Sequence, residues 1–205
     1  MTSPIFSDEE IALLSDPSWF RLRARALREL EQLLLRLGEQ LRARLAGDGY
    51  LRPAEVDLGE GKLAKGDHLE DLPYIYLDLP RSLDEQSLFT FRTLFWWGHE
   101  ISFSLLLSGR HLSEYRARLL QNLGILEALD VYVSTAESPW DWRRGPGHTL
   151  RLSEGERGTL ERLFRKQAFL KCSRYLEFNA AEFRQMRIDD AAILSFRALE
   201  PLILA

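Results

Sequence analysis

Five side chains capable of acid–base or anion-binding chemistry gather between positions 76 and 100: Tyr76, Asp78, Arg92, His99 and Glu100. An arginine holds a phosphate or carboxylate through two parallel hydrogen bonds, and a nearby histidine or carboxylate can move a proton. One interpretation is therefore an enzyme site for a small anionic substrate around Arg92. The other is an Asp78–Arg92 ion pair that ties two strands together, and we prefer it because structural ion pairs commonly fill such positions.

Further polar and aromatic side chains share the predicted sheet face with this pair. The candidate ligand-binding residues are Tyr76, Asp78, Arg92, Trp96, His99, Ser102, Ser104 and Lys65. Lys65 belongs to a segment, residues 47–71, whose glycines and charges predict a loop. We expect Lys65 to lean over the polar face from this loop.

Motifs for metals, nucleotides and nucleophilic catalysis fail on their spacing. His99-Glu100 begins like the zinc motif H-E-x-x-H, but Phe103 stands where the second histidine belongs. The glycines near residue 60 do not fit a phosphate-binding loop, and no G-x-S-x-G run occurs. We therefore expect no metal, no cofactor and no identifiable catalytic residue.

Alternation with period two predicts the strands that position the candidate residues. A hairpin with the three-residue loop Gly98-His99-Glu100 would pair Trp97 with Ile101 and Phe95 with Phe103, leaving Arg92 on a polar face. A two-residue loop would place Arg92 among aliphatic side chains, where an unpaired guanidinium costs several kcal/mol. We prefer the three-residue loop. A shorter strand between Pro73 and Pro80 carries Tyr76 and Asp78 on its polar side.

Three runs of sequence resemble a family of soluble bacterial proteins that has no established activity. They are AKGD at residues 64–67, LPYIYLDLPR at 72–81 and FRTLFWWGHEISFSLLLSG at 91–109. The resemblance covers about a fifth of the chain. It implies an α+β fold and brings no catalytic residues.

Composition limits the class of protein. The 205 residues carry a net charge of -4, which argues against nucleic acid as a partner, and 45% hydrophobic residues are ordinary for a globular domain. Cys172 is the single cysteine, which fits the cytoplasm, and the first 16 residues resemble no signal peptide. No apolar run is long enough to cross a membrane.

The remaining pattern predicts the architecture. Asp16 and Pro17 open a long helix that ends near Ala46, with apolar residues at three- and four-residue spacing. We expect one α+β domain: a helical segment over 1–46, a sheet core over 72–134 with about four or five antiparallel strands, and a helical segment over 153–205. The two helical segments are expected to cover the sheet.

Two function classes remain open. The leading one is a non-enzymatic cytosolic binding or interaction protein that uses the polar sheet face or the loop with Trp140, Trp142, Arg143 and Arg144. The alternative is the enzyme acting on a small anionic substrate around Arg92. The partner is thus an unknown protein or a small anion. The sequence leaves the oligomeric state open.

Overall fold

A computed structural model describes residues 5–47, 49–53, 56–59, 61–83, 87–179, 183 and 188–204 of the chain. Its elements, in chain order, are α1 (Asp8–Ser15), α2 (Pro17–Leu45), β1 (Lys62–Leu69), β2 (Leu72–Leu83), β3 (Leu88–Trp96), β4 (Glu100–Ser108), α3 (Leu112–Gln121), α4 (Leu123–Ala128), β5 (Tyr132–Ser134), β6 (Thr149–Arg151), the 3₁₀ turn η1 (Glu154–Glu156), α5 (Arg157–Phe164), β7 (Phe169–Glu177), α7 (Ile188–Leu199) and the 3₁₀ turn η2 (Glu200–Leu202). The predicted α+β class is confirmed.

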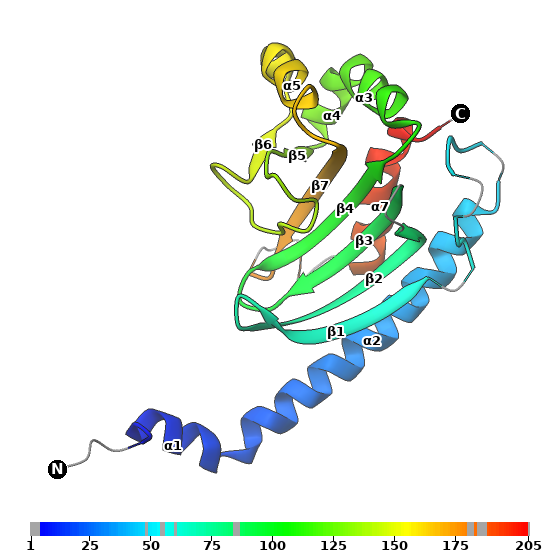
Figure 1. Cartoon of the computed structure of the whole chain (residues 1–205). Coiled ribbons are helices and arrows are strands. Elements are labelled where there is room, and N and C mark those ends of the chain that lie inside the picture. The colour runs from blue at the N-terminus through cyan, green and yellow to red at the C-terminus, as the bar shows by residue number, and fades with distance from the viewer. Residues whose placement is uncertain are drawn as a thin grey trace.

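The strands form one antiparallel sheet in the order β1-β2-β3-β4-β7-β5-β6 (Figure 1). It has seven strands, so the expected four or five was too few. β1, β6 and β7 lie outside the predicted sheet core over 72–134, and β7 runs through the segment predicted to be helical over 153–205.

The missed strand β1 is an edge strand with a largely exposed, charged sequence. Its residues show no apolar alternation because neither of its faces is deeply buried, and pairing with β2 holds it in place. Charged side chains are common on edge strands, where they discourage pairing with other chains. The loop predicted over 47–71 is therefore wrong for 62–69.

The β3–β4 hairpin confirms the predicted faces but not the predicted pairs. Phe95 pairs with Ile101 and Thr93 with Phe103, so the three-residue loop is Trp97-Gly98-His99. A displacement of two residues keeps every side chain on its predicted face, because alternation has period two. Gly98 adopts a φ of 78°, which a residue with a side chain rarely takes.

Pro80 does not end β2, which continues to Leu83. The pairing of β2 with β3 shifts between Asp78 and Arg81, and Pro80 lies within this irregularity. A proline is tolerated there because the ladder does not use its missing N–H.

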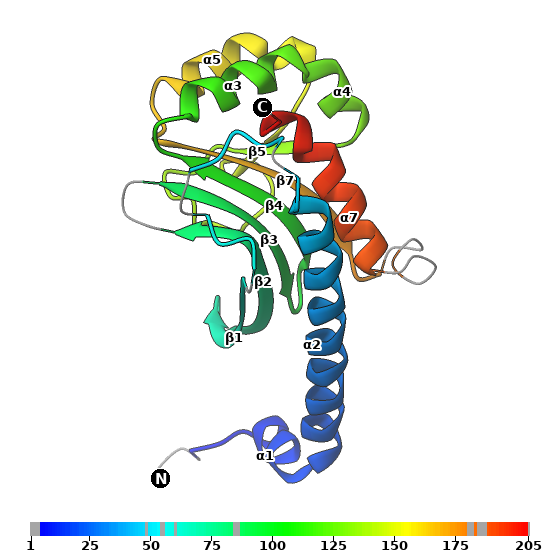
Figure 2. The same ribbon diagram turned by 90° about the vertical axis from the view of Figure 1, so that its right-hand side faces the viewer.

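Helices α2 and α7 lie side by side on one face of the sheet (Figure 2). The C-terminal half of α2 buries a stripe at helical spacing that consists of Leu34, Leu37, Leu41 and Leu45. From α7, Phe196 meets Phe91 of β3 edge to face, with 5.2 Å between ring centres. This face carries the main hydrophobic core.

The N-terminal end of α2 extends beyond the sheet, and α1 turns off from it at an angle (Figures 1 and 2). We call residues 5–28 the N-terminal arm. Asp16 caps α2 as predicted, because its carboxylate accepts a 2.8 Å hydrogen bond from the Ser18 amide. α1 has no buried residue, residues 17–33 of α2 are at most partly buried, and the first fully buried residue of α2 is Leu34. The long helix therefore covers the sheet chiefly with its C-terminal half, while Leu27 and Leu30 add partly buried contacts with the core.

None of the helices in the described ranges combines the length and the apolar character that crossing a bilayer requires.

Candidate functional site

Asp78 and Arg92 form a buried ion pair on the sheet face opposite α2 and α7. They stand directly across from each other on β2 and β3. Arg92 donates from Nε to Oδ1 and from Nη2 to Oδ2 of Asp78, both at 2.6 Å. Asp78 is 0% exposed and Arg92 is 7% exposed. The pair is bidentate, so both carboxylate oxygens and one edge of the guanidinium are occupied.

Three aromatic rings enclose the guanidinium of Arg92. Its central carbon lies 3.8 Å from the ring centre of Tyr76, 4.8 Å from Trp142 and 5.3 Å from Trp140. The tryptophans come from the loop between β5 and β6, so this loop packs over the face of the sheet. Stacking on aromatic rings stabilises a desolvated cation. Arg92 is thus shielded on several sides.

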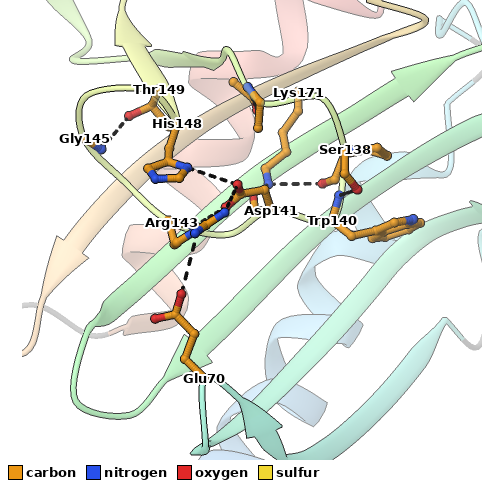
Figure 3. A network of polar contacts seen from close by, with 12 residues as sticks. Glu70, Ser138, Trp140, Asp141, Arg143, Gly145, His148, Thr149 and Lys171 are labelled. Carbon is orange, nitrogen blue, oxygen red and sulfur yellow. Dashed lines mark hydrogen bonds and ion pairs between the residues drawn. The ribbon is translucent and has the colours of Figure 1, made fainter.

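Lys171 holds this loop against β7 (Figure 3). Its ammonium donates to the carbonyl of Pro139 at 3.1 Å and to that of Asp141, and it lies 3.8 Å from the ring centre of Trp142. The side chain is almost fully buried. Burial lowers the pKa of Lys171 to about 7, although the nearby Asp141 carboxylate acts in the opposite direction and Arg92 adds to the lowering.

Asp141 organises the outer side of the same loop (Figure 3). It accepts hydrogen bonds from Arg143 at 2.6 and 2.9 Å, and His148 Nδ1 lies 3.0 Å from its second oxygen. The hydrogen bonds from Arg143 hold the pKa of Asp141 well below its usual range. Arg143 also approaches Glu70 to 3.8 Å, which links the loop to the β1–β2 turn.

The stability of the protein should depend on pH through Lys171. The unfolded chain keeps this proton up to about 10.5 and the folded chain loses it near 7, so unfolding takes up a proton in between. The free energy of unfolding should therefore rise by up to about 1.4 kcal/mol per pH unit between pH 7 and 8.5. This range stays below 9.0, the ordinary pKa of the Cys172 thiol in the unfolded chain, so the thiol adds little to the slope. Urea denaturation at several pH values measures this slope.

Lys171→Met is the control for this prediction. The variant keeps the aliphatic stem but has no titratable group, so the Lys171 contribution to the slope should vanish while that of every other group remains. Equal slopes in the two proteins would contradict the lowered pKa.

The other candidate residues on this face contribute to the packing and hydrogen bonding of the sheet. Ser104 shares a 2.7 Å hydrogen bond with Ser173 of β7. Ser102 is buried, and its hydroxyl has no hydrogen-bond partner among the described atoms. Trp96 is buried and donates from Nε1 to the Leu69 carbonyl at 3.0 Å. Together with Leu94, Leu106 and Trp142, Trp96 forms a small second core on this face.

His99 is not brought to Arg92. It stacks on Trp96, with 3.7 Å between ring centres, in the turn at the end of the hairpin. Trp96 itself is four residues beyond Arg92, or roughly 13 Å along an extended strand. His99 is therefore too far from Arg92 to exchange a proton with an anion bound there.

His99 instead lines a cleft of about 760 Å³ at the hairpin end, together with Glu100 and Arg144. Arg144 donates to Glu100 at 3.0 Å and to the Tyr132 hydroxyl at 3.2 Å, and it approaches Glu177 to 3.5 Å. Burial raises the pKa of Glu100, and Arg144 opposes this effect. Two carboxylates already surround the arginine of this cleft, so it offers little attraction to an anion.

Lys65 lies on the opposite face from the one expected. It is in strand β1, pairs with Ile75 and forms a 2.5 Å ion pair with Glu31 of α2. Residues directly opposite in a sheet point to the same side, and Ile75 belongs to the core under the helices. The expectation that Lys65 leans over the polar face was wrong, because its segment is a strand with a fixed side-chain direction.

A second cleft, of about 920 Å³, opens beside Trp140 at the other end of the sheet. Leu83, Leu88, Leu163 and Phe169 give it apolar walls, and Lys166 and Glu137 contribute charges. Neither Arg92 nor His99 lines it.

Sequence reasoning did not find Lys171 or the Asp141 network. The signal for Lys171 was the alternation of Lys171, Ser173 and Tyr175, which a strand places on one face. The neighbouring Cys172 is free and fully buried, and burial raises the pKa of its thiol. Within the described residues, no group of three or more His, Cys, Asp or Glu side chains is placed to hold a metal ion.

The largest set of exposed apolar side chains lies on the N-terminal arm. Ile5 is 90% exposed, Leu14 and Trp19 are each 62% exposed, and each of the others is about half exposed. The set consists of Ile5, Phe6, Ile11, Leu13, Leu14, Trp19, Phe20 and Leu22. Many exposed apolar side chains gathered on one segment are a feature of interaction sites in folded proteins.

No family model, curated protein or solved structure matches the chain. The family resemblance of residues 64–67, 72–81 and 91–109 therefore stays a prediction. The function has to follow from the surfaces and side chains of this molecule.

Proposed function

We propose that the chain is a non-enzymatic cytosolic binding protein that docks a protein partner through the N-terminal arm. The observation that carries this proposal is the row of apolar side chains on residues 5–22, a segment in which every residue is exposed. A cytosolic setting fits a free and buried Cys172.

The spacing of apolar residues on α2 supports docking by the arm. Phe20, Leu27 and Leu34 follow one another at intervals of seven, so they lie on nearly the same side of the helix. Leu34 is fully buried on the sheet and Leu27 is partly buried, whereas Phe20 is 51% exposed. The stripe that packs within the molecule therefore continues into the arm, where it is available to another surface.

The polar sheet face and the tryptophan loop are poorer docking surfaces. Trp142 is buried against Arg92 and Lys171, and the cation of Arg92 is matched by Asp78. The alternative of an enzyme acting on a small anionic substrate at Arg92 has the same difficulty, because its anion must compete with a bidentate carboxylate. Phosphates and small carboxylates should therefore leave the melting temperature unchanged.

Photo-crosslinking in living cells tests the proposal. A benzophenone side chain placed at Trp19 should give covalent adducts with a protein partner. The same group placed at Leu35 is the matched control, since Leu35 is also on α2, is 53% exposed and lies outside the arm. Adducts at position 19 but not at 35 support docking by the arm. No adduct at 19, or equal adducts at both positions, would contradict it.

A further inference from the structure

The N-terminal arm separates its charges along the chain. Its first part carries Asp8, Glu9, Glu10 and Asp16 without a basic residue. The part on α2 carries Arg21, Arg23, Arg25 and Arg28 without an acidic residue. Each half of the arm therefore complements the other half in sign, while the arm as a whole is neutral.

The exposed apolar side chains of the arm lead to an apolar groove. The groove has a volume of about 420 Å³ and lies where α2 passes the hairpin turn, lined by Ala26, Leu30, Trp97 and Phe178 among others. Trp19, Ala26 and Leu30 share one side of α2, at intervals of seven and four. Trp19 thus lies on the same side of α2 as this groove, with the exposed Leu22 and the Arg23–Asp67 ion pair between them.

From these two features we propose that the partner of the arm is a second copy of this chain. The two arms pair about a two-fold axis, with α1 of each copy against the basic part of α2 of the other, and their apolar side chains meet between them. A two-fold interface must be complementary to itself, and a helix pair with one acidic and one basic half meets this condition. The proposal rests on the docking role of the arm and specifies its partner.

The size of the arm sets an upper limit on such an interface. Even if every one of residues 5–28 took part, the arm would only reach the roughly 20–30 residues that one side of a standard protein interface contains. The apolar centre includes Trp19 and Phe20, and large aromatic side chains are the common anchors of interfaces.

The charges of the arm favour a second copy over a lipid surface. An amphipathic helix that binds anionic lipid carries an excess of Lys and Arg on its polar side. Here the four arginines of residues 5–28 are balanced by four carboxylates, three of them at the start of α1. The carboxylates would be repelled by an anionic membrane, and the arginines of a second copy would attract them.

Sedimentation velocity of the full chain with paired charge reversals tests this proposal. Wild type should sediment at twice the chain mass of 23.8 kDa as its concentration rises. Asp8→Lys/Glu9→Lys brings the charge of the acidic half from -4 to 0, and Arg21→Glu/Arg25→Glu brings that of the basic half from +4 to 0. Each variant alone should self-associate about tenfold or more weakly, because both contacts of its dimer then lose the attraction between opposite charges. An equimolar mixture of the two should regain the dimer, since one contact of the mixed dimer again joins an unchanged acidic half to an unchanged basic half.

Two single variants separate the arm from the rest of α2. Trp19→Asp should abolish the dimer, and Leu35→Asp, also at an exposed apolar position of α2, should leave it intact. Unchanged melting temperatures of dilute samples show that the variants fold.

Two results would overturn the proposal that the partner is a second copy. One is a wild-type chain that sediments at 23.8 kDa at every concentration, and the other is a mixture that fails to regain the dimer. Binding of the monomer to anionic vesicles would point to a membrane instead and overturns it equally. Adducts at position 19 with a different protein would leave the docking role standing while this proposal fails.

Discussion

Replacing Asp78 with alanine should lower the free energy of unfolding by about 3–5 kcal/mol, because the variant leaves a buried guanidinium without its carboxylate. Arg92 is 7% exposed and lies beneath Trp142, so water cannot readily take the place of Asp78. Urea denaturation at pH 7 measures the loss, and the dependence of this free energy on urea concentration should stay unchanged if both proteins unfold in two states.

Two controls give this result its meaning. Asp78→Leu/Arg92→Met removes both charges and should recover most of the lost stability, since apolar replacement of a whole buried pair is often neutral. Arg151→Met breaks the ion pair with Asp130, in which both side chains are more than half exposed. It should lower the free energy of unfolding by less than about 1 kcal/mol. A loss at Asp78 no larger than that at Arg151 would mean that water reaches Arg92.

Phe91→Ala should destabilise the protein by about 3–5 kcal/mol through the cavity it leaves in the main core. Phe91 is fully buried on β3 and meets Phe196 of α7 edge to face. The loss should therefore loosen α7 from the sheet, and hydrogen exchange of the α7 amides should become faster than that of the α3 amides.

Phe20→Ala is the matched control, because it removes the same side chain from an exposed position of the N-terminal arm. In dilute protein its effect on unfolding should stay within about 0.5 kcal/mol. Similar losses at positions 20 and 91 would contradict the assignment of the core to the face under α2 and α7.

Where a strand alternates between apolar and polar residues, the sequence was enough to assign its side chains to a face. Asp78 and Arg92 are polar at alternating positions among apolar residues, so each was assigned to the polar side, and β2 and β3 pair them directly. Asp16 was recognisable as a cap because Pro17 follows it. These features depend on local pattern and backbone geometry, which a single sequence carries.

The parts that were missed depend on contacts between distant segments. The alternation in β7 gives the face on which Lys171 lies but not its burial, which comes from the loop with Trp142 that folds over it. The strand β1 lacks apolar alternation and exists through its pairing with β2. His99 was grouped with Arg92 because the two are close in sequence. The extended strand between them carries them far apart in space, so they do not meet.

The position of α2 beside β1 bears on how the chain avoids polymerising through its sheet. Two ion pairs, Arg23 with Asp67 and Lys65 with Glu31, join this helix to the edge strand. An unguarded edge can recruit strands from other molecules and grow without limit. A chain shortened to begin at residue 27 would lose Arg23 together with most of the apolar arm. It would keep the pair of Lys65 with Glu31 but leave the edge strand less shielded, so we expect it to aggregate more readily than the full chain.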